Sequence, residues 1–210
     1  MNIFVLCTGR SGSKTFIKAC NHITNYTCGH ESRAKRAKLE SRLTLDYPPN
    51  HIEADNRLSW FLGRLDERYG DEAFYVHLIR EKGAVAQSFY RRWKNPGTII
   101  SAYGYSLLKQ RYIAPDDRLP ICLDYQETVN SNIRLFLKDK TKVMTMHLES
   151  ITEQFPIFWN YIGAFGNLDE ALGVLQIPHN ISPPEKISGL VMSIITAKTK
   201  ISKLFKDSRI

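Results

Sequence analysis

The chain has 210 residues, of which 43% are hydrophobic and 24% charged, and its formal net charge at pH 7 is +8. These proportions are ordinary for a globular protein and exclude a disordered or fibrous class, while the length suits one domain over residues 1–210 better than two large ones. The positive charge favours an anionic partner. The charge alone does not distinguish among phosphorylated cofactors, acidic glycans, nucleic acid and anionic lipid.

The cysteines and the first residues give no indication of export. Cys7, Cys20, Cys28 and Cys122 lack paired spacing, which fits a reducing compartment, and we expect a cytoplasmic protein. The apolar run at the start is too short for a signal-peptide core and has no basic region ahead of it. No window approaches the roughly eighteen uncharged apolar residues that span a bilayer.

The first residues predict a buried strand that leads into a phosphate-binding loop. Ile3–Leu6 is a short apolar run, and residues 16–20 have helical character. Between them come glycines, hydroxyls and cations, namely Gly9, Arg10, Ser11, Gly12, Ser13, Lys14 and Thr15. The glycines allow backbone N–H groups to point inward, and the helix N-terminus adds partial positive charge, so we expect a bound phosphate.

A simpler interpretation of this loop is a surface turn with solvated cations. The loop also differs from a Walker A motif, because Ser13 rather than a glycine precedes Lys14. The density of glycine, hydroxyl and basic residues so close behind a strand favours phosphate binding.

Residues 26–29 predict a second strand, with Glu31 just beyond its end. Ligands of parallel sheets bind at the carboxyl ends of the strands, so Glu31 is expected near the loop and is a candidate general base. Residues 32–45 have the composition of a helix with a basic face, for which solvent exposure is a better explanation than nucleic-acid binding. Residues 51–55 predict a weaker third strand.

The middle of the chain continues the alternation of strands and helices. A helix ends near Gly70, and residues 73–79 form the most strand-like run, which ends at Arg80. A helix over about residues 83–93 carries Ser88. Residues 95–120 are intermediate between loop and irregular helix, which suggests an acceptor-binding lid. A helix over 125–137 and a strand over 142–148 then complete a parallel α/β core of four to five strands within residues 1–150.

Residues 151–210 show helical patterns and no evident strand. Short helices are expected over 155–162 and 168–175, and a final helix begins at a capping box over 182–185. Its last turns carry Lys198, Lys200, Lys203 and Lys206. Peripheral membrane contact or a partner helix would fit these lysines, although packing on the domain with the lysines in solvent is favoured.

Over residues 1–150 the motifs resemble the sulfotransferases that use 3′-phosphoadenosine-5′-phosphosulfate (PAPS), in particular the tyrosylprotein-type and bacterial enzymes. Residues 10–15 look like their 5′-phosphosulfate loop. Arg80 and Ser88, with seven residues between them, match the pair that holds the 3′-phosphate. Residues 28–33 are similar to the segment that carries the catalytic glutamate of tyrosylprotein sulfotransferases, here Glu31.

The resemblance implies a P-loop-type three-layer fold and a sulfuryl transfer from PAPS to a hydroxyl or amine, which releases adenosine 3′,5′-bisphosphate and needs no metal. Arg10 and Lys14 would stabilise the leaving phosphate, and Glu31 would take the proton, with His30 as the alternative base. Two departures stand out: Lys14 replaces the usual threonine or serine, and the C-terminal glycine-rich cofactor segment of the cytosolic small-molecule enzymes has no counterpart.

Two other functions remain open. A P-loop kinase would use ATP and Mg²⁺, with Asp55 holding the metal. A non-catalytic anion-binding protein would not need Glu31. The acceptor, whether carbohydrate, peptide, lipid or small molecule, and the oligomeric state are not specified by the sequence, and Glu149 is expected to be structural.

Overall fold

The computed structural model describes residues 1–34, 44–95 and 97–177. Most of the basic helix expected over residues 32–45 and the whole final helix with its lysines lie outside these ranges, so both stay predictions. Within the described ranges, no helix is both long and apolar enough to cross a membrane. The four cysteines are free thiols.

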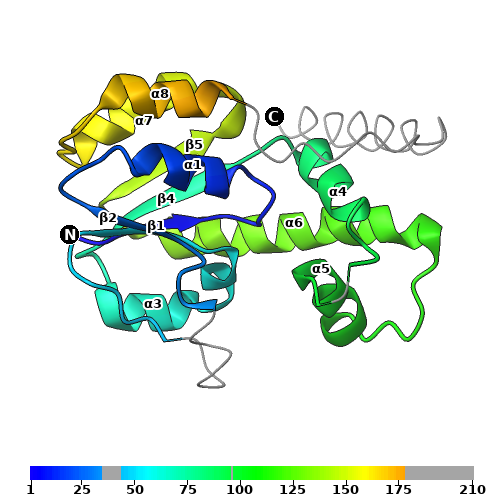
Figure 1. Cartoon of the computed structure of the whole chain (residues 1–210). Helices are drawn as coiled ribbons and strands as arrows, with labels where there is room; N and C mark the ends of the chain where they lie inside the picture. Colours follow the sequence, from blue (N-terminus) through cyan, green and yellow to red (C-terminus); the bar gives the residue numbers. More distant parts are fainter. Residues whose placement is uncertain (35–43, 96, 178–210) are drawn as a thin grey trace, which may run out of the picture. The chain divides into compact units, whose positions relative to one another are not determined.

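A five-stranded parallel sheet forms the centre of the fold, as the sequence predicted (Figure 1). The strand order is β2 (Thr27–His30), β3 (His51–Ala54), β1 (Ile3–Leu6), β4 (Phe74–Ile79) and β5 (Val143–His147). In the central strand β1, Ile3 pairs with Ile52 on one side and with Phe74 on the other. All four residues of β1 are buried, which explains why its sequence is continuously apolar.

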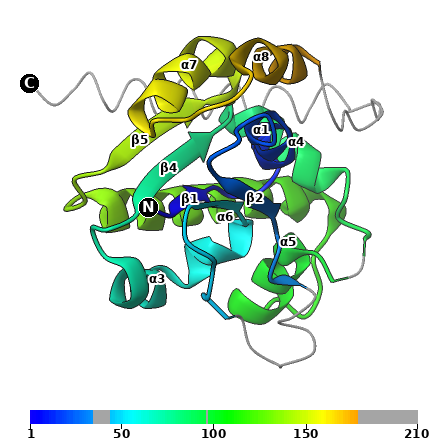
Figure 2. The same ribbon diagram turned by 60° about the vertical axis from the view of Figure 1, so that its left-hand side comes forward.

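Helices cover both faces of the sheet (Figures 1 and 2). One face carries α1 (Ser13–Cys20), α7 (Ile151–Tyr161) and α8 (Leu168–Gln176), and the other carries η1 (Asn56–Trp60), α3 (Leu62–Tyr69) and α6 (Pro115–Leu137). The remaining elements are α4 (Lys82–Tyr90), which packs on α6, together with α5 (Ile99–Ala102), η2 (Tyr103–Leu107) and η3 (Leu148–Ser150). The three-layer α/β fold is therefore confirmed.

The two faces of β1 contribute to two aromatic clusters. Ile3 and Val5 belong to the core under α1, α7 and α8, where Phe158 packs on Phe16 with ring centroids 5.2 Å apart. Phe4 points the other way, and its ring lies 4.6 Å from that of Tyr69 on α3. The alternation of side chains along one strand thus joins both helical layers.

Two of the boundaries that differ from the sequence-based expectation concern the site. Helix α6 begins at Pro115 rather than near residue 125, so residues 115–120 are regular helix rather than loop or irregular helix. Pro115 occupies the first helical position, where the N–H that proline lacks would have no intrahelical partner. The negative charges of Asp116 and Asp117 stabilise the first turn by interacting with the helix dipole. Helix α1 begins at Ser13, so Ser13, Lys14 and Thr15 belong to a helical turn instead of the loop.

The buried contacts of α7 predict a sharp difference between neighbouring positions. Phe158 is fully buried and Ile157 is 59% exposed. We expect Phe158→Ala to lower the free energy of unfolding by about 3–5 kcal/mol, because it removes a buried ring and leaves a cavity. Ile157→Ala on the same helix is the control and should change it by less than about 0.5 kcal/mol. Urea unfolding of both variants tests this, and equal losses would contradict the assignment of the buried face.

Candidate functional site

The loop after β1 has an unusual backbone. Gly9, Arg10 and Gly12 have φ angles of 80°, 60° and 87°, in the left-handed region that favours glycine. At Gly12 a Cβ atom would also lie 2.4 Å from Leu148 Cδ1, so a larger residue would have to displace the Leu148 side chain. At Arg10 the same conformation costs about 1 kcal/mol, which surrounding contacts must offset.

Hydrogen bonds from the opposite face of the sheet fix the start of this loop. The Tyr125 hydroxyl on α6 donates to the Thr8 carbonyl at 2.8 Å, and the Ser59 hydroxyl on η1 donates to the Cys7 carbonyl at 3.1 Å. The buried Ser11 hydroxyl lies 3.1 Å from the Thr8 hydroxyl. Since the Ser11 side chain is used within the loop, its contribution to an anion site would come from its backbone N–H.

The N-terminus of α1 faces the same loop. Gly12 is its N-cap residue, and no side chain caps it, so the N–H groups of the first turn have no intrahelical partner. Lys14 in this turn is exposed, and Thr15 is buried. The Ser13 hydroxyl lies 3.1 Å from Nε2 of His30, at the end of β2. An uncapped helix N-terminus beside a glycine loop is a general anion-binding arrangement.

Arg10, Arg80 and Ser88 come together although they lie far apart in the sequence. Arg80, directly after β4, donates from Nη1 to the Arg10 carbonyl at 3.1 Å. Arg10 in turn donates from Nε to the hydroxyl of Ser88, on α4, at 2.9 Å. The sequence placed Arg10 at one phosphate and the other two residues at another, whereas in the structure the three form one connected group.

Two further arginines extend this group. Burial, followed in order of effect by the charges of Arg92, Arg80 and Arg91, lowers the pKa of Arg10 to about 10. The Nε atoms of Arg91 and Arg92 are buried without a hydrogen-bond partner. Among the residues that the structure describes, no carboxylate pairs with any of these four arginines. Neighbouring guanidinium groups without a carboxylate partner are suited to a multiply charged anion.

Arg91 and Arg92 are site residues that were not predicted from the sequence. They follow Ser88 by three and four positions, the spacing that places side chains on the same side of a helix. That spacing was the available signal. It carried little weight because surface arginines at such positions are common.

The predicted base lies on the other side of the loop. Glu31 is exposed, follows β2 directly with a φ of 51°, and donates its backbone N–H to the Ala54 carbonyl at 3.0 Å. Hydrogen bonding to Asp55 raises the pKa of Arg57, and the charges of Asp55 and Glu31 add to the rise. Burial raises the pKa of Cys7 to about 11, with smaller contributions from the same two carboxylates. The ends of β1, β2 and β3 therefore meet at one edge, as predicted.

Asp55, which would hold the metal in a kinase, is hydrogen-bonded to an arginine in the structure. It is 1% exposed, and both carboxylate oxygens accept from the guanidinium of Arg57, at 2.9 and 2.5 Å. It also accepts from the Arg57 backbone N–H as the N-cap of η1. No group of three metal-ligating side chains occurs in the described ranges. Glu149 accepts from the Glu81 backbone N–H at 2.9 Å, a structural contact.

Comparison with known proteins finds similarity at the level of structure. No family model matches the sequence, and no curated protein is significantly similar to it. A sulfotransferase from Alicyclobacillus acidocaldarius superposes with a TM-score of 0.53 and 10% identity, over 93% of this chain and 90% of that one. This chain has the fold of that bacterial sulfotransferase. Mouse sulfotransferase SULT7A1, solved in complex with PAP, gives a TM-score of 0.47 and 13% identity, over 89% of this chain and 69% of the mouse chain.

The mutual repulsion of the arginines gives a prediction. We expect Arg92→Gln to raise the thermal midpoint at low salt, because it removes a charge that disfavours the protonated form of Arg10. The gain should shrink in high salt, where charges are screened. Arg134→Gln is the control, since Arg134 pairs with Glu127 at 3.3 Å on the surface and its loss should have little effect. A midpoint that falls at low salt in Arg92→Gln would contradict the repulsion.

Proposed function

We propose that the protein is a PAPS-dependent sulfotransferase that transfers a sulfuryl group to a hydroxyl or amine of an acceptor and releases adenosine 3′,5′-bisphosphate. The observation that carries the proposal is the connected group of Arg10, Arg80 and Ser88, reinforced by Arg91 and Arg92. ATP has a free 3′-hydroxyl and therefore gives no reason for a cationic group that extends from the phosphate loop to Arg80 and Ser88. The fold shared with a bacterial sulfotransferase supports the same assignment.

In this proposal the donor binds across the loop. Arg80 and Ser88, together with the charges of Arg91 and Arg92, hold the 3′-phosphate through charge-assisted hydrogen bonds. The 5′-phosphosulfate lies at the free N–H groups of the loop and of the first turn of α1, a segment that comprises Ser11, Gly12, Ser13, Lys14 and Thr15. Arg10, between the two, contributes its guanidinium to the same anion.

The transfer needs one bond to form and one to break at sulfur. The acceptor oxygen or nitrogen attacks sulfur, the bond from sulfur to the 5′-phosphate oxygen breaks, and its electron pair leaves with that phosphate. Arg10 and Lys14 stabilise the charge that develops on the leaving oxygens. Glu31 receives the acceptor proton, a contribution of about 10²–10⁴ in rate. The residues that hold and move charge in this step all belong to the protein, and no metal is proposed.

The proposal includes the cellular setting. Four free cysteines favour a reducing compartment, so the cytoplasm is the proposed location. In this proposal the cationic groups of the site bind the phosphates of PAPS, so nucleic acid is not proposed as a partner.

Donor binding can be tested without knowing the acceptor. We expect adenosine 3′,5′-bisphosphate, at a hundred times its dissociation constant and without Mg²⁺, to stabilise the fold by about 2.7 kcal/mol. This corresponds to a rise of several degrees in the thermal midpoint. Arg80→Ala should remove most of the rise, and Arg68→Ala, on the exposed side of α3, should leave it intact. Stabilisation by ATP with Mg²⁺ and not by the bisphosphate would favour a kinase.

The role of Glu31 can be separated from binding. Glu31→Gln keeps the shape of the side chain and removes its basicity, so turnover of PAPS should fall by at least about tenfold while the affinity for adenosine 3′,5′-bisphosphate stays unchanged. Turnover would be measured as release of the bisphosphate with a panel of a phenol, a tyrosine peptide and monosaccharides. A smaller loss, together with a large loss in His30→Ala, would make His30 the base, and a donor-binding protein without turnover would be non-catalytic.

A further inference from the structure

A fully buried carboxylate lies within the sheet next to the turn that carries Glu31. Glu53, in the middle of β3, is 0% exposed. Gly29 on the neighbouring strand leaves room for it, because a Cβ atom there would lie 2.5 Å from Glu53 Oε2. A charge in such a place is costly unless its oxygens are fully hydrogen-bonded.

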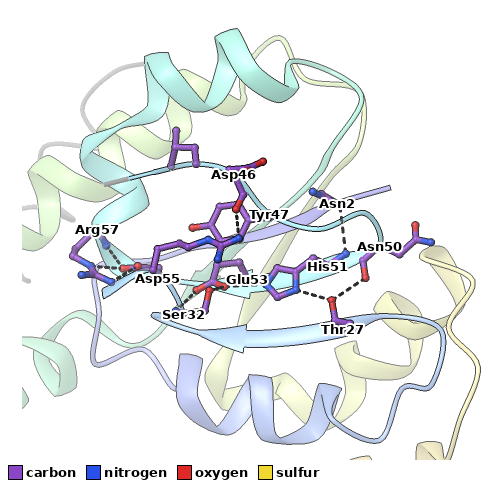
Figure 3. Close-up of polar contacts among 12 residues, drawn as sticks. Asn2, Thr27, Ser32, Asp46, Tyr47, Asn50, His51, Glu53, Asp55 and Arg57 are labelled. Atoms are coloured by element: carbon purple, nitrogen blue, oxygen red, sulfur yellow. Dashed lines mark hydrogen bonds and ion pairs between the residues drawn. The ribbon is translucent and has the colours of Figure 1, made fainter. Parts of the chain in front are cut away.

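Both oxygens of Glu53 bind the residue that follows Glu31. The Ser32 backbone N–H donates to Oε1 at 2.8 Å, and the Ser32 hydroxyl donates to Oε2 at 2.5 Å (Figure 3). The preceding N–H, that of Glu31, donates to the carbonyl of Ala54. Two consecutive residues of β3 therefore fix two consecutive peptide groups of the turn.

A second set of contacts holds Glu53 itself. His51 Nε2 lies 3.0 Å from Glu53 Oε2, and Nδ1 of the same ring lies 2.8 Å from the Thr27 hydroxyl. The Tyr47 ring stacks on His51 with centroids 5.5 Å apart. Burial acts to raise the pKa of Glu53, but hydrogen bonds from His51 and Ser32 outweigh it and lower the pKa, so the side chain is a carboxylate at neutral pH.

We propose that Glu53 is a positioning residue, which holds the strained turn after β2 so that Glu31 points its carboxylate into the candidate active site. The left-handed conformation of Glu31 is unfavourable for a non-glycine residue and persists only where surrounding bonds determine it. Glu53 supplies two of these bonds. It accepts three hydrogen bonds in all, which suits a carboxylate, whereas an amide would present an N–H₂ group to one of the donors. The inference rests on the proposed function, in which Glu31 is the base.

The test compares Glu53→Gln and Ser32→Ala with the wild-type chain. We expect turnover of PAPS in Glu53→Gln to fall by up to about 10²-fold, because a misplaced base loses its alignment. The dissociation constant of adenosine 3′,5′-bisphosphate should stay unchanged, as should the cooperative thermal transition. Ser32→Ala removes one of the two bonds at an exposed residue and should give an intermediate loss, which keeps the inference testable should Glu53→Gln fail to fold.

Asp71→Asn is a structurally matched control. Asp71 accepts from the backbone N–H and the hydroxyl of Thr141, at 2.8 and 2.6 Å, at the amino ends of β4 and β5. Its replacement breaks the same kind of bond pair at the opposite edge of the sheet and should leave turnover unchanged. Wild-type turnover in both Glu53→Gln and Ser32→Ala, with Glu31→Gln inactive, would overturn the positioning role and leave the proposed function intact.

A second readout does not depend on sulfotransferase activity. The Ser32 amide should exchange its hydrogen about tenfold faster or more in Glu53→Gln, because it loses a bond to a charged acceptor. Nuclear magnetic resonance of the labelled protein measures this rate. If the wild-type chain releases no bisphosphate from PAPS with any acceptor, the proposed function fails, and faster exchange still supports the role of Glu53 in holding the turn. Unchanged exchange overturns that role in either case.

Discussion

The repulsion that three neighbouring guanidinium groups exert on Arg10 is the constraint that the site depends on. The group consists of Arg10, Arg80, Arg91 and Arg92. The fold holds Arg10 and Arg80 through a serine hydroxyl and a backbone carbonyl, which are neutral acceptors and leave their charge in place. Elsewhere in the described part of the chain, Arg57, Arg68 and Arg134 are paired with carboxylates. Because Arg10 and Arg80 bind neutral acceptors instead of carboxylates, their positive charge stays available to a ligand.

The loop that presents this charge is held from both layers of the fold. Helix α1 continues from the loop and packs in the core with α7 and α8, while Tyr125 and Ser59 reach the loop from α6 and η1 on the other face. Because these hydrogen bonds go to carbonyls of Thr8 and Cys7, they leave the N–H groups free to face an anion. The left-handed backbone at Arg10 is thus supported by elements that do not themselves compete for the ligand.

The sequence was sufficient for features that depend on local patterns. The apolar run of β1 and its glycine-rich continuation predicted the central strand and the loop, because a strand buried on both faces has few alternatives. The start of α6 was placed wrongly, because Pro115 and Pro120 are loop signals, whereas in the structure Pro115 occupies the first turn and Pro120 lies inside the helix. Glu53 was also missed. A carboxylate in a short strand weakens the strand pattern, and only the partners His51 and Ser32 show why it is there.

The strand order separates the two kinds of charge in the candidate site. Glu31 follows β2 and Arg80 follows β4, which lie three strand spacings apart, about 14 Å, with the loop of β1 between them. If the carboxylate lay beside the arginines, the two would form an ion pair, and the carboxylate would be held by the guanidinium groups. The same pair would neutralise the cluster that is suited to phosphate. Separation by the sheet therefore leaves a carboxylate on one side of the loop of β1 and an uncompensated cationic group on the other.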